Sequence, residues 1–127
     1  MSYYFSKTIN LPFDAAIAHV TEKLKTEGFG ILTDIDVRAT MKKKLDVEFR
    51  NYRILGACNP PFALQALQAE DKIGTMLPCN VIVQETDAGV EVAAVDPLAS
   101  MSAVDNPRLG QIGQQVRAKL QAVIDRV

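Results

Sequence analysis

The end of the chain, residues 107–127, carries the pattern that most restricts how this sequence can fold. Asn106 followed by Pro107 is typical of a helix start, because the asparagine side chain can accept a hydrogen bond from the first turn. Apolar residues then recur at three- and four-residue spacing, at Leu109, Ile112, Val116, Leu120, Val123 and Val127. A helix with one apolar face has to bury that face, and we predict that it packs on a sheet. Gly113 lies on or beside the stripe, which predicts a close approach of helix and sheet backbones.

The rest of the chain alternates between strand-like and helix-like patterns. Strands are expected over residues 3–9, 29–37, 52–58, 76–85 and 90–95. The turn at residues 87–89 should join the last two strands as a hairpin. Helices are expected from Pro12 to a stop at Gly28, over residues 38–46, and from Pro60 or Pro61 toward Asp71.

The predicted order is therefore β-α-β-(α)-β-(α)-β-β-α. Neighbouring strands joined by turns and short helical excursions favour an α+β fold with a mostly antiparallel five-stranded sheet, packed against the long C-terminal helix. At 127 residues, with no repeat and no linker, the sequence predicts a single domain over residues 1–127.

Composition excludes several classes of protein. The chain has 14 basic and 15 acidic residues, so it has no overall field that would attract nucleic acid or an anionic membrane. Its one basic block, Lys42-Lys43-Lys44, is typical of a solvated helix face. The N-terminal residues lack the pattern of a secretory signal, and no apolar run approaches the about 18 residues of a membrane span. We therefore expect a cytoplasmic protein without nucleic-acid or membrane partners, whose two cysteines remain thiols.

Two Cys-Asn pairs mark the candidate site. Cys58-Asn59 ends one predicted strand before Pro60, and Cys79-Asn80 begins the next. If these strands are adjacent and antiparallel, both cysteines lie at the same end of the sheet. A thiolate is a soft ligand or a nucleophile, and an asparagine supplies both a donor and an acceptor, so the combination suits a polar pocket. The alternative is that both thiols are small buried hydrophobes and both asparagines hold turns.

Other candidate groups are weaker. Asp96 before Pro97 is typical of a capped strand end, and it falls near Cys79 if the last two strands pair. His19, the single histidine, lies in a helix beside charged residues, so it is a poor base for a cysteine nucleophile. Two thiols and one histidine do not make a convincing zinc set, and we predict no metal site from one chain. Asp34 and Asp36 are better explained by a solvated strand face than by a cation site.

The sequence resembles the uncharacterised bacterial and archaeal family called domain of unknown function 302. The resemblance is carried by the segments 52–60, 73–74, 77–81 and 96–97, together with Gly28-Phe29-Gly30 and Asp34-Ile35-Asp36. It covers nearly the whole chain. It implies a TBP-like α+β fold, with an antiparallel sheet gripped by a long C-terminal helix, and assembly as a homodimer. It marks Cys58, Asn59, Pro60, Cys79 and Asn80 as a site, and it implies no activity.

Three functions are compatible with these observations. The first is binding of a small molecule or a soft ion in a pocket around Cys58, Asn59, Pro60, Cys79, Asn80 and Asp96. The second is a thiol-dependent enzyme or redox protein, in which Cys58 and Cys79 attack and resolve. The third is a structural homodimer without a ligand. The sequence identifies no cofactor and no reaction.

Overall fold

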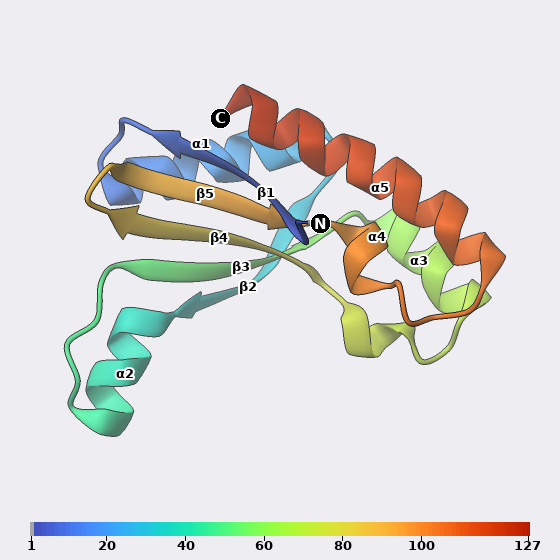
Figure 1. Cartoon of the computed structure of the whole chain (residues 1–127), viewed down its shortest axis with the longest axis horizontal. Coiled ribbons are helices and arrows are strands. Elements are labelled where there is room, and N and C mark those ends of the chain that lie inside the picture. The colour runs from blue at the N-terminus through green and yellow to red at the C-terminus, as the bar shows by residue number, and fades with distance from the viewer. Residues whose placement is uncertain (1) are drawn as a thin grey trace.

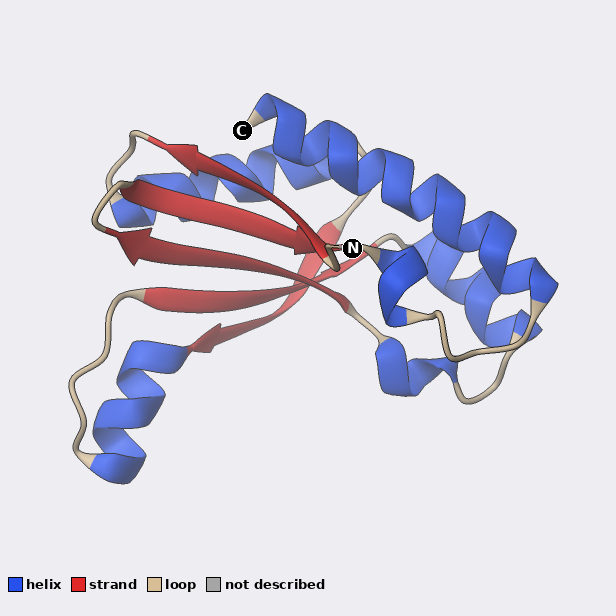
Figure 2. Cartoon of the chain, in the orientation of Figure 1, coloured by secondary structure: helices blue, strands red, loops and turns tan. Residues whose placement is uncertain are grey.

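The computed structural model describes residues 2–127, and it has α+β architecture (Figures 1 and 2). The strands are β1 (Tyr4–Ile9), β2 (Gly30–Asp36), β3 (Tyr52–Cys58), β4 (Cys79–Thr86) and β5 (Gly89–Val95). The helices are α1 (Phe13–Thr26), α2 (Val37–Leu45), α3 (Pro60–Ala69), the 3-10 helix η1 (Ile73–Met76), α4 (Pro97–Ser100) and α5 (Pro107–Arg126).

The five strands form one sheet in the order β1-β5-β4-β3-β2, and every neighbouring pair is antiparallel. The predicted fold class is therefore confirmed, as is the hairpin between β4 and β5. Because β1 and β2 lie at opposite ends of this order, they are the two edge strands.

One face of the sheet is buried under α1 and α5 (Figure 1). Burial along β4 shows this: Cys79, Val81 and Val83 are buried, whereas the residues between them are exposed or half-buried. Side chains alternate across a strand, so only one face of β4 meets the helices. The apolar stripe predicted for the C-terminal helix is on α5, where Leu109, Val116, Leu120 and Val123 are buried as expected.

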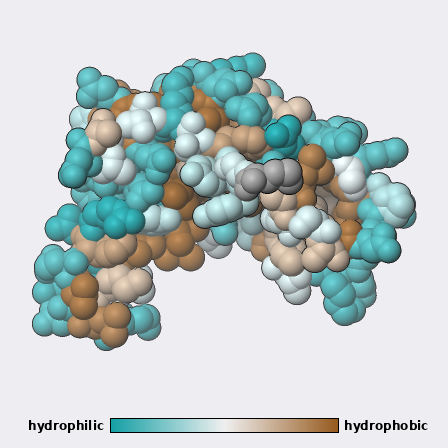
Figure 3. All heavy atoms as spheres, in the orientation of Figure 1, coloured by the Kyte–Doolittle hydropathy of each residue, from teal (hydrophilic) through white to brown (hydrophobic). Residues whose placement is uncertain are grey.

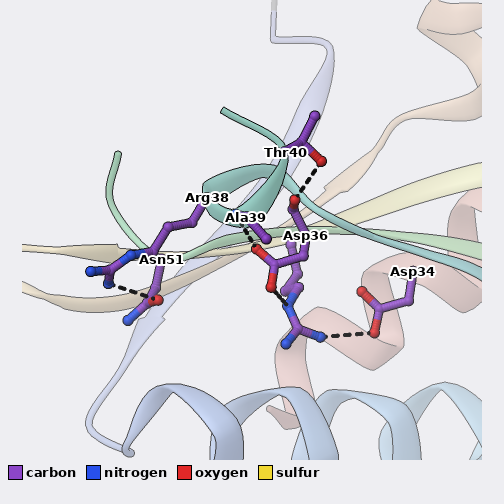
Figure 4. Close-up of polar contacts among 7 residues, drawn as sticks. Asp34, Asp36, Arg38, Ala39, Thr40 and Asn51 are labelled. Atoms are coloured by element: carbon purple, nitrogen blue, oxygen red, sulfur yellow. Dashed lines mark hydrogen bonds and ion pairs between the residues drawn. The ribbon is translucent and has the colours of Figure 1, made fainter. Parts of the chain in front are cut away.

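The helix α2 begins where β2 ends. The Asp36 side chain accepts a hydrogen bond from the backbone N–H of Ala39, and Arg38 donates to Asn51 (Figure 4). Arg53 on β3 lies 3.0 Å from an oxygen of Asp34 and 3.5 Å from an oxygen of Asp36. The two carboxylates of β2 are thus used to cap a helix and to bind an arginine.

Two local predictions are wrong, and one short helix was not predicted. The fourth strand begins at Cys79 rather than at residue 76, because residues 73–76 turn into η1, where Thr75 N–H donates to the carbonyl of Lys72. The short helix α4 follows Asp96 and was not predicted. Gly113 does not meet the sheet backbone: a Cβ at this position would lie 3.1 Å from Leu98 of α4, so the glycine makes room for that side chain.

Among the described residues, no helix has the length and apolar character needed to cross a membrane.

Candidate ligand-binding pocket

Cys58 and Cys79 meet at one end of the sheet. β3 and β4 pair in antiparallel register, with Ala57 opposite Cys79, so Cys58 is one residue beyond that pair. The adjacency predicted from strand order is therefore confirmed. Both cysteines are free thiols, Cys79 buried and Cys58 half-buried, and both line the same pocket.

The pocket lies beyond the ends of β2, β3 and β4, between α3, α4 and α5, with a cavity volume of about 270 Å³. It is lined by Phe29, Leu32, Ala57, Cys58, Asn59, Phe62, Ala63, Ala66, Leu67, Leu77, Pro78, Cys79, Pro97, Met101, Ile112, Gly113 and Val116. Asn59 is the one side chain in this set with an amide, and none carries a charge. The expected polar pocket is therefore an apolar one.

Asn59 has a structural task at the pocket wall. Its Nδ2 donates a hydrogen bond of 3.0 Å to the carbonyl of Glu27, so the amide ties the start of α3 to the turn after α1. Gly28 in that turn has φ +86°, and a Cβ there would lie 3.1 Å from the same Nδ2. The asparagine holds a turn, as the alternative interpretation of the sequence proposed.

Three of the residues assigned to the site from sequence do not line the pocket. Pro60 is exposed at the first turn of α3. Asn80 follows Cys79 in β4, so its side chain is on the opposite face of the sheet, where it is exposed. Asp96 is close in sequence to the lining residue Pro97 but points elsewhere.

Asp96 is buried in a cluster of its own. One carboxylate oxygen accepts from the backbone N–H of Leu98 at 3.0 Å and so caps α4, and the other accepts from Nε of Arg117 at 3.1 Å. The Arg117 guanidinium also lies 5.0 Å from the ring centroid of Phe5. Asp96 therefore joins β5, α4 and α5. Its capping was predicted from the Asp-Pro pair, but its ion pair was not.

Burial raises the pKa of the Cys79 thiol from its ordinary value of 9.0 to about 11, and the neighbouring Cys58 adds to the rise. At neutral pH this thiol is protonated, so it is a poor nucleophile and a poor metal ligand. Cys79 thus behaves as a small apolar residue of the pocket wall.

The raised pKa of Cys79 predicts a loss of stability at high pH. Below pH 9.0 the thiol is protonated in both the folded and the unfolded chain, so the full stability is present. Between pH 9.0 and about 11 the unfolded chain ionises first, and stability should fall by about 2 to 3 kcal/mol in total. Urea unfolding of the wild type and of Cys79→Ala over this range measures the difference. Cys58→Ala is the control and should keep most of the decline; a Cys79→Ala chain with the same decline as wild type would contradict the assignment.

Within residues 2–127 no group of three or more histidine, cysteine, aspartate or glutamate side chains is placed to hold a metal ion. His19, on α1, is not among the residues that line the pocket. The lining also contains no histidine or carboxylate that could serve Cys58 as a base.

Sequence reasoning missed much of the pocket wall. Ile112, Gly113 and Val116 come from α5, and only their position on the apolar stripe was available as a signal. Leu32 lies at a register shift between Ile31 and Thr33, and 66% of it is exposed although it lines the pocket. A bulge of this kind re-aims a side chain at the end of a sheet.

A second hollow, of about 420 Å³, lies on the sheet face that α1 and α5 leave uncovered. It contains Tyr3, Tyr4, Tyr52, Asn80, Gln84 and Glu91 among its lining residues. Gln84 donates a hydrogen bond to Glu91 at 2.8 Å and accepts one from Arg50 at 2.8 Å. The polar side chains at this hollow therefore bond to one another. Its floor is a single sheet, whereas the apolar pocket is bounded by three helices as well as strand ends, and we therefore take the apolar pocket as the candidate site.

The chain is thus an α+β domain whose antiparallel sheet and overhanging terminal helix enclose an apolar pocket with a thiol in its wall. Residues 5–127 match the family model for the domain of unknown function DUF302, and the chain belongs to this family. It is similar to the crystal structure of an uncharacterised conserved DUF302 protein from Bacillus stearothermophilus, with 25% identity and a TM-score of 0.92, over 99% of this chain and 98% of that chain. No curated protein sequence matches it. The fold is therefore that of the family.

Proposed function

We propose that this protein is a binding module whose pocket at the end of the sheet takes a small, uncharged, apolar molecule. The observation that carries the proposal is the lining: seventeen residues from six helices and strands and their connecting loops surround the cavity, and apolar side chains dominate it. A ligand gains affinity there by leaving water. A polar ligand would lose its hydrogen bonds to water and find almost none in return.

The volume limits the size of the ligand. A dry apolar cavity of about 150 Å³ is enough for benzene. At about 270 Å³ this pocket suits a compact molecule of one or two rings, or a short branched chain. The pocket is at the small end of the range for ligand sites, which is about 300 to 1,000 Å³.

The other functions expected from sequence have less support. A soft ion needs thiolates, and burial keeps Cys79 protonated at neutral pH. A thiol enzyme needs a base within hydrogen-bond reach of its nucleophile, and the pocket lining contains none. We therefore favour a small apolar molecule over both.

Cys58 provides a direct readout of ligand binding. It is half-buried and lines the pocket, whereas Cys79 is 9% exposed and has a raised pKa. At pH 8 iodoacetamide should therefore alkylate Cys58 first, and Cys79 only after unfolding. Saturation with indole or naphthalene, two uncharged apolar probes, should slow alkylation of Cys58 at least about tenfold, because alkylation needs the ligand-free pocket. Mass spectrometry of the two cysteine peptides measures both rates.

Pocket-filling variants give this experiment its control. Ala63→Leu places a larger side chain into the lining and should remove the protection by either probe. Gln65→Leu adds the same side chain at an exposed position of α3 and should leave the protection intact. Equal protection in Ala63→Leu and in the wild type, or no protection at saturating probe, would exclude the pocket as the binding site.

A further inference from the structure

A second cavity lies on the sheet face that α1 and α5 leave uncovered, and the proposed function does not use it. In Figure 1 the strands lie in front of α1, and the space-filling view from the same side shows patches of apolar surface over them, bordered by polar side chains (Figure 3). This is the hollow of about 420 Å³, and it shares no lining residue with the apolar pocket. Asn80, from the second Cys-Asn pair, lines this hollow, whereas Cys79 lines the pocket. The two neighbouring residues therefore belong to two separate cavities.

The floor of the hollow contains a small residue near the middle of the sheet. Ala93 of β5 pairs with Ile82 of β4 and with Ser6 of β1, and side chains opposite one another in an antiparallel pair lie on the same face. No helix covers this face, and Ala93 is not part of the core under α1 and α5, yet only 7% of it is exposed. The larger side chains around Ala93 therefore rise above it and enclose a depression, in which a flat apolar group gains affinity by leaving water.

Tyrosine rings lie on two sides of this floor. β1 and β3 flank the central pair β5 and β4, and Tyr4 and Tyr52 line the hollow from these flanking strands. Tyr3 lies beside Tyr4, with the ring centroids 5.0 Å apart and the rings at 71° to one another. Tyr3 and Tyr4 are 69% and 42% exposed, so their rings are open to a ligand. A tyrosine ring attracts a second aromatic ring at its face or edge, and it attracts a cation at its face.

Glu91 is the one lining residue of the hollow that is charged at neutral pH. It lies two residues before Ala93 on β5, so the two side chains are on the same face, and it is half-buried. Oε1 of its carboxylate accepts a hydrogen bond from Nε2 of Gln84 at 2.8 Å. Within residues 2–127 no group donates to the other oxygen, Oε2, which is therefore open to a donor on a ligand.

No basic side chain lies opposite Glu91. Its partners on the neighbouring strands are Thr8 and Gln84, and neither is charged. Arg50 reaches the same glutamine from outside the lining: its Nε donates to Oε1 of Gln84 at 2.8 Å, and its guanidinium lies 5.5 Å from the ring centroid of Tyr52. Gln84 thus lies between the arginine and the glutamate, and within the described part of the chain Glu91 forms no salt bridge. The hollow therefore offers a negative charge that a cation can approach.

We infer that this hollow is a second binding site, which takes a small molecule with a primary amine and an aromatic ring. The ammonium group donates to Oε2 of Glu91 in a charge-assisted hydrogen bond. The ring lies over Ala93, where it leaves water and contacts the tyrosine rings. An anion would meet the carboxylate without any cation in the lining, and an uncharged hydrocarbon would bury Oε2 without a partner. This inference goes beyond the proposed function, which concerns the other cavity.

Isothermal titration calorimetry with tryptamine, an aromatic primary amine, tests the chemical class of the ligand. At pH 7 the wild type should bind tryptamine with a dissociation constant below about 1 mM. It should bind 3-indolepropionate, which joins the same ring to a carboxylate, at least about tenfold more weakly, because like charges repel. Equal affinity for the two molecules, or no heat of binding with tryptamine up to about 10 mM, would overturn the inference.

Removing one charge tests where the amine binds. Glu91→Gln keeps the size of the side chain and can still accept from Gln84, and it should weaken tryptamine binding at least about tenfold. Glu22→Gln is the matched control, since it removes a carboxylate that pairs with Lys25 on α1, on the other face of the sheet, and it should bind as the wild type does. Tyr4→Leu keeps an apolar side chain but removes the ring, and it should weaken binding severalfold. Wild-type affinity in Glu91→Gln would mean that the amine does not contact this carboxylate, and the site would be rejected.

Filling one cavity at a time separates this site from the apolar pocket. Ala93→Leu fills the floor of the hollow and should abolish tryptamine binding, while indole still protects Cys58 from alkylation. Ala63→Leu fills the apolar pocket and should do the reverse. Urea unfolding establishes that both variants fold, and Glu91→Gln takes the place of Ala93→Leu if that chain does not fold. If Ala63→Leu removes tryptamine binding and Ala93→Leu does not, the amine occupies the apolar pocket and the inference is wrong.

Discussion

Replacing Leu120 with alanine should destabilise the protein by about 3 to 4 kcal/mol, the largest single effect we expect. Leu120 lies on α5, is 0% exposed, and belongs to the core that α1 and α5 form with the sheet. The substitution removes three carbons and with them the free energy gained by transferring these carbons from water to the core. It also leaves a cavity that the rigid sheet cannot move to fill.

Urea unfolding followed by circular dichroism measures this change. Leu11→Ala is the control, since Leu11 is 37% exposed and should cost less than about 1 kcal/mol. Leu120 does not line the pocket, so the folded variant should still bind apolar probes. A loss of less than 1 kcal/mol for Leu120→Ala would mean that α5 is not anchored to the sheet as described.

The end of a strand was predictable where local chemistry fixes it. β3 was expected over residues 52–58 and is Tyr52–Cys58, because Pro60 and Pro61 have no N–H to donate to a ladder. β4 was placed three residues early, since Met76 and Leu77 suggest a strand. Ile73 in the preceding η1 is instead 1% exposed in the core, and the chain turns to bury it. Tertiary packing decided that boundary.

The site was predictable in part, and one available signal was not used. Strand order brought Cys58 and Cys79 together correctly. The same period-two alternation that predicts a strand also places consecutive residues on opposite faces, so Cys79 and Asn80 cannot both face one pocket. The two residues were predicted to share a site because Cys79-Asn80 repeats the residue pair Cys58-Asn59.

The parts of the site that could not be predicted depend on contacts between segments that are far apart in the sequence. The apolar character of the pocket depends on Ile112 and Val116 of α5 and on Phe62 of α3, and on the angle at which these helices extend beyond the strand ends. The bond between Asp96 and Arg117 likewise joins β5 to α5. No local sequence pattern specifies which distant residues will meet in this way. Each contact becomes evident only when the position of the helices on the sheet is known.

Replacing Gly56 with alanine should cost about 2 to 3 kcal/mol and also disturb the pocket. Gly56 is buried in the middle of β3, on the sheet face opposite the core helices. A Cβ there would overlap Oγ1 of Thr33 on β2 and would lie 2.7 Å from Cγ of Pro78. The pairing of β2 with β3 fixes the backbone of Thr33, whose side chain can only rotate. The closed ring of Pro78 cannot turn away, so the added methyl group must displace Pro78.

Gly30→Ala is the matched control on the neighbouring strand. A Cβ at Gly30 would have nothing within 4 Å, and this variant should be as stable as the wild type or slightly more stable. Pro78 lines the pocket beside Cys79, so the displacement forced by Gly56→Ala should also expose the buried thiol. Alkylation of Cys79 in the folded protein should become measurable in Gly56→Ala and stay undetected in Gly30→Ala. If Gly56→Ala unfolds at the same urea concentration as Gly30→Ala, Thr33 and Pro78 do not pack closely over β3. Pro78 would then not form the wall that separates the pocket from the open face of the sheet.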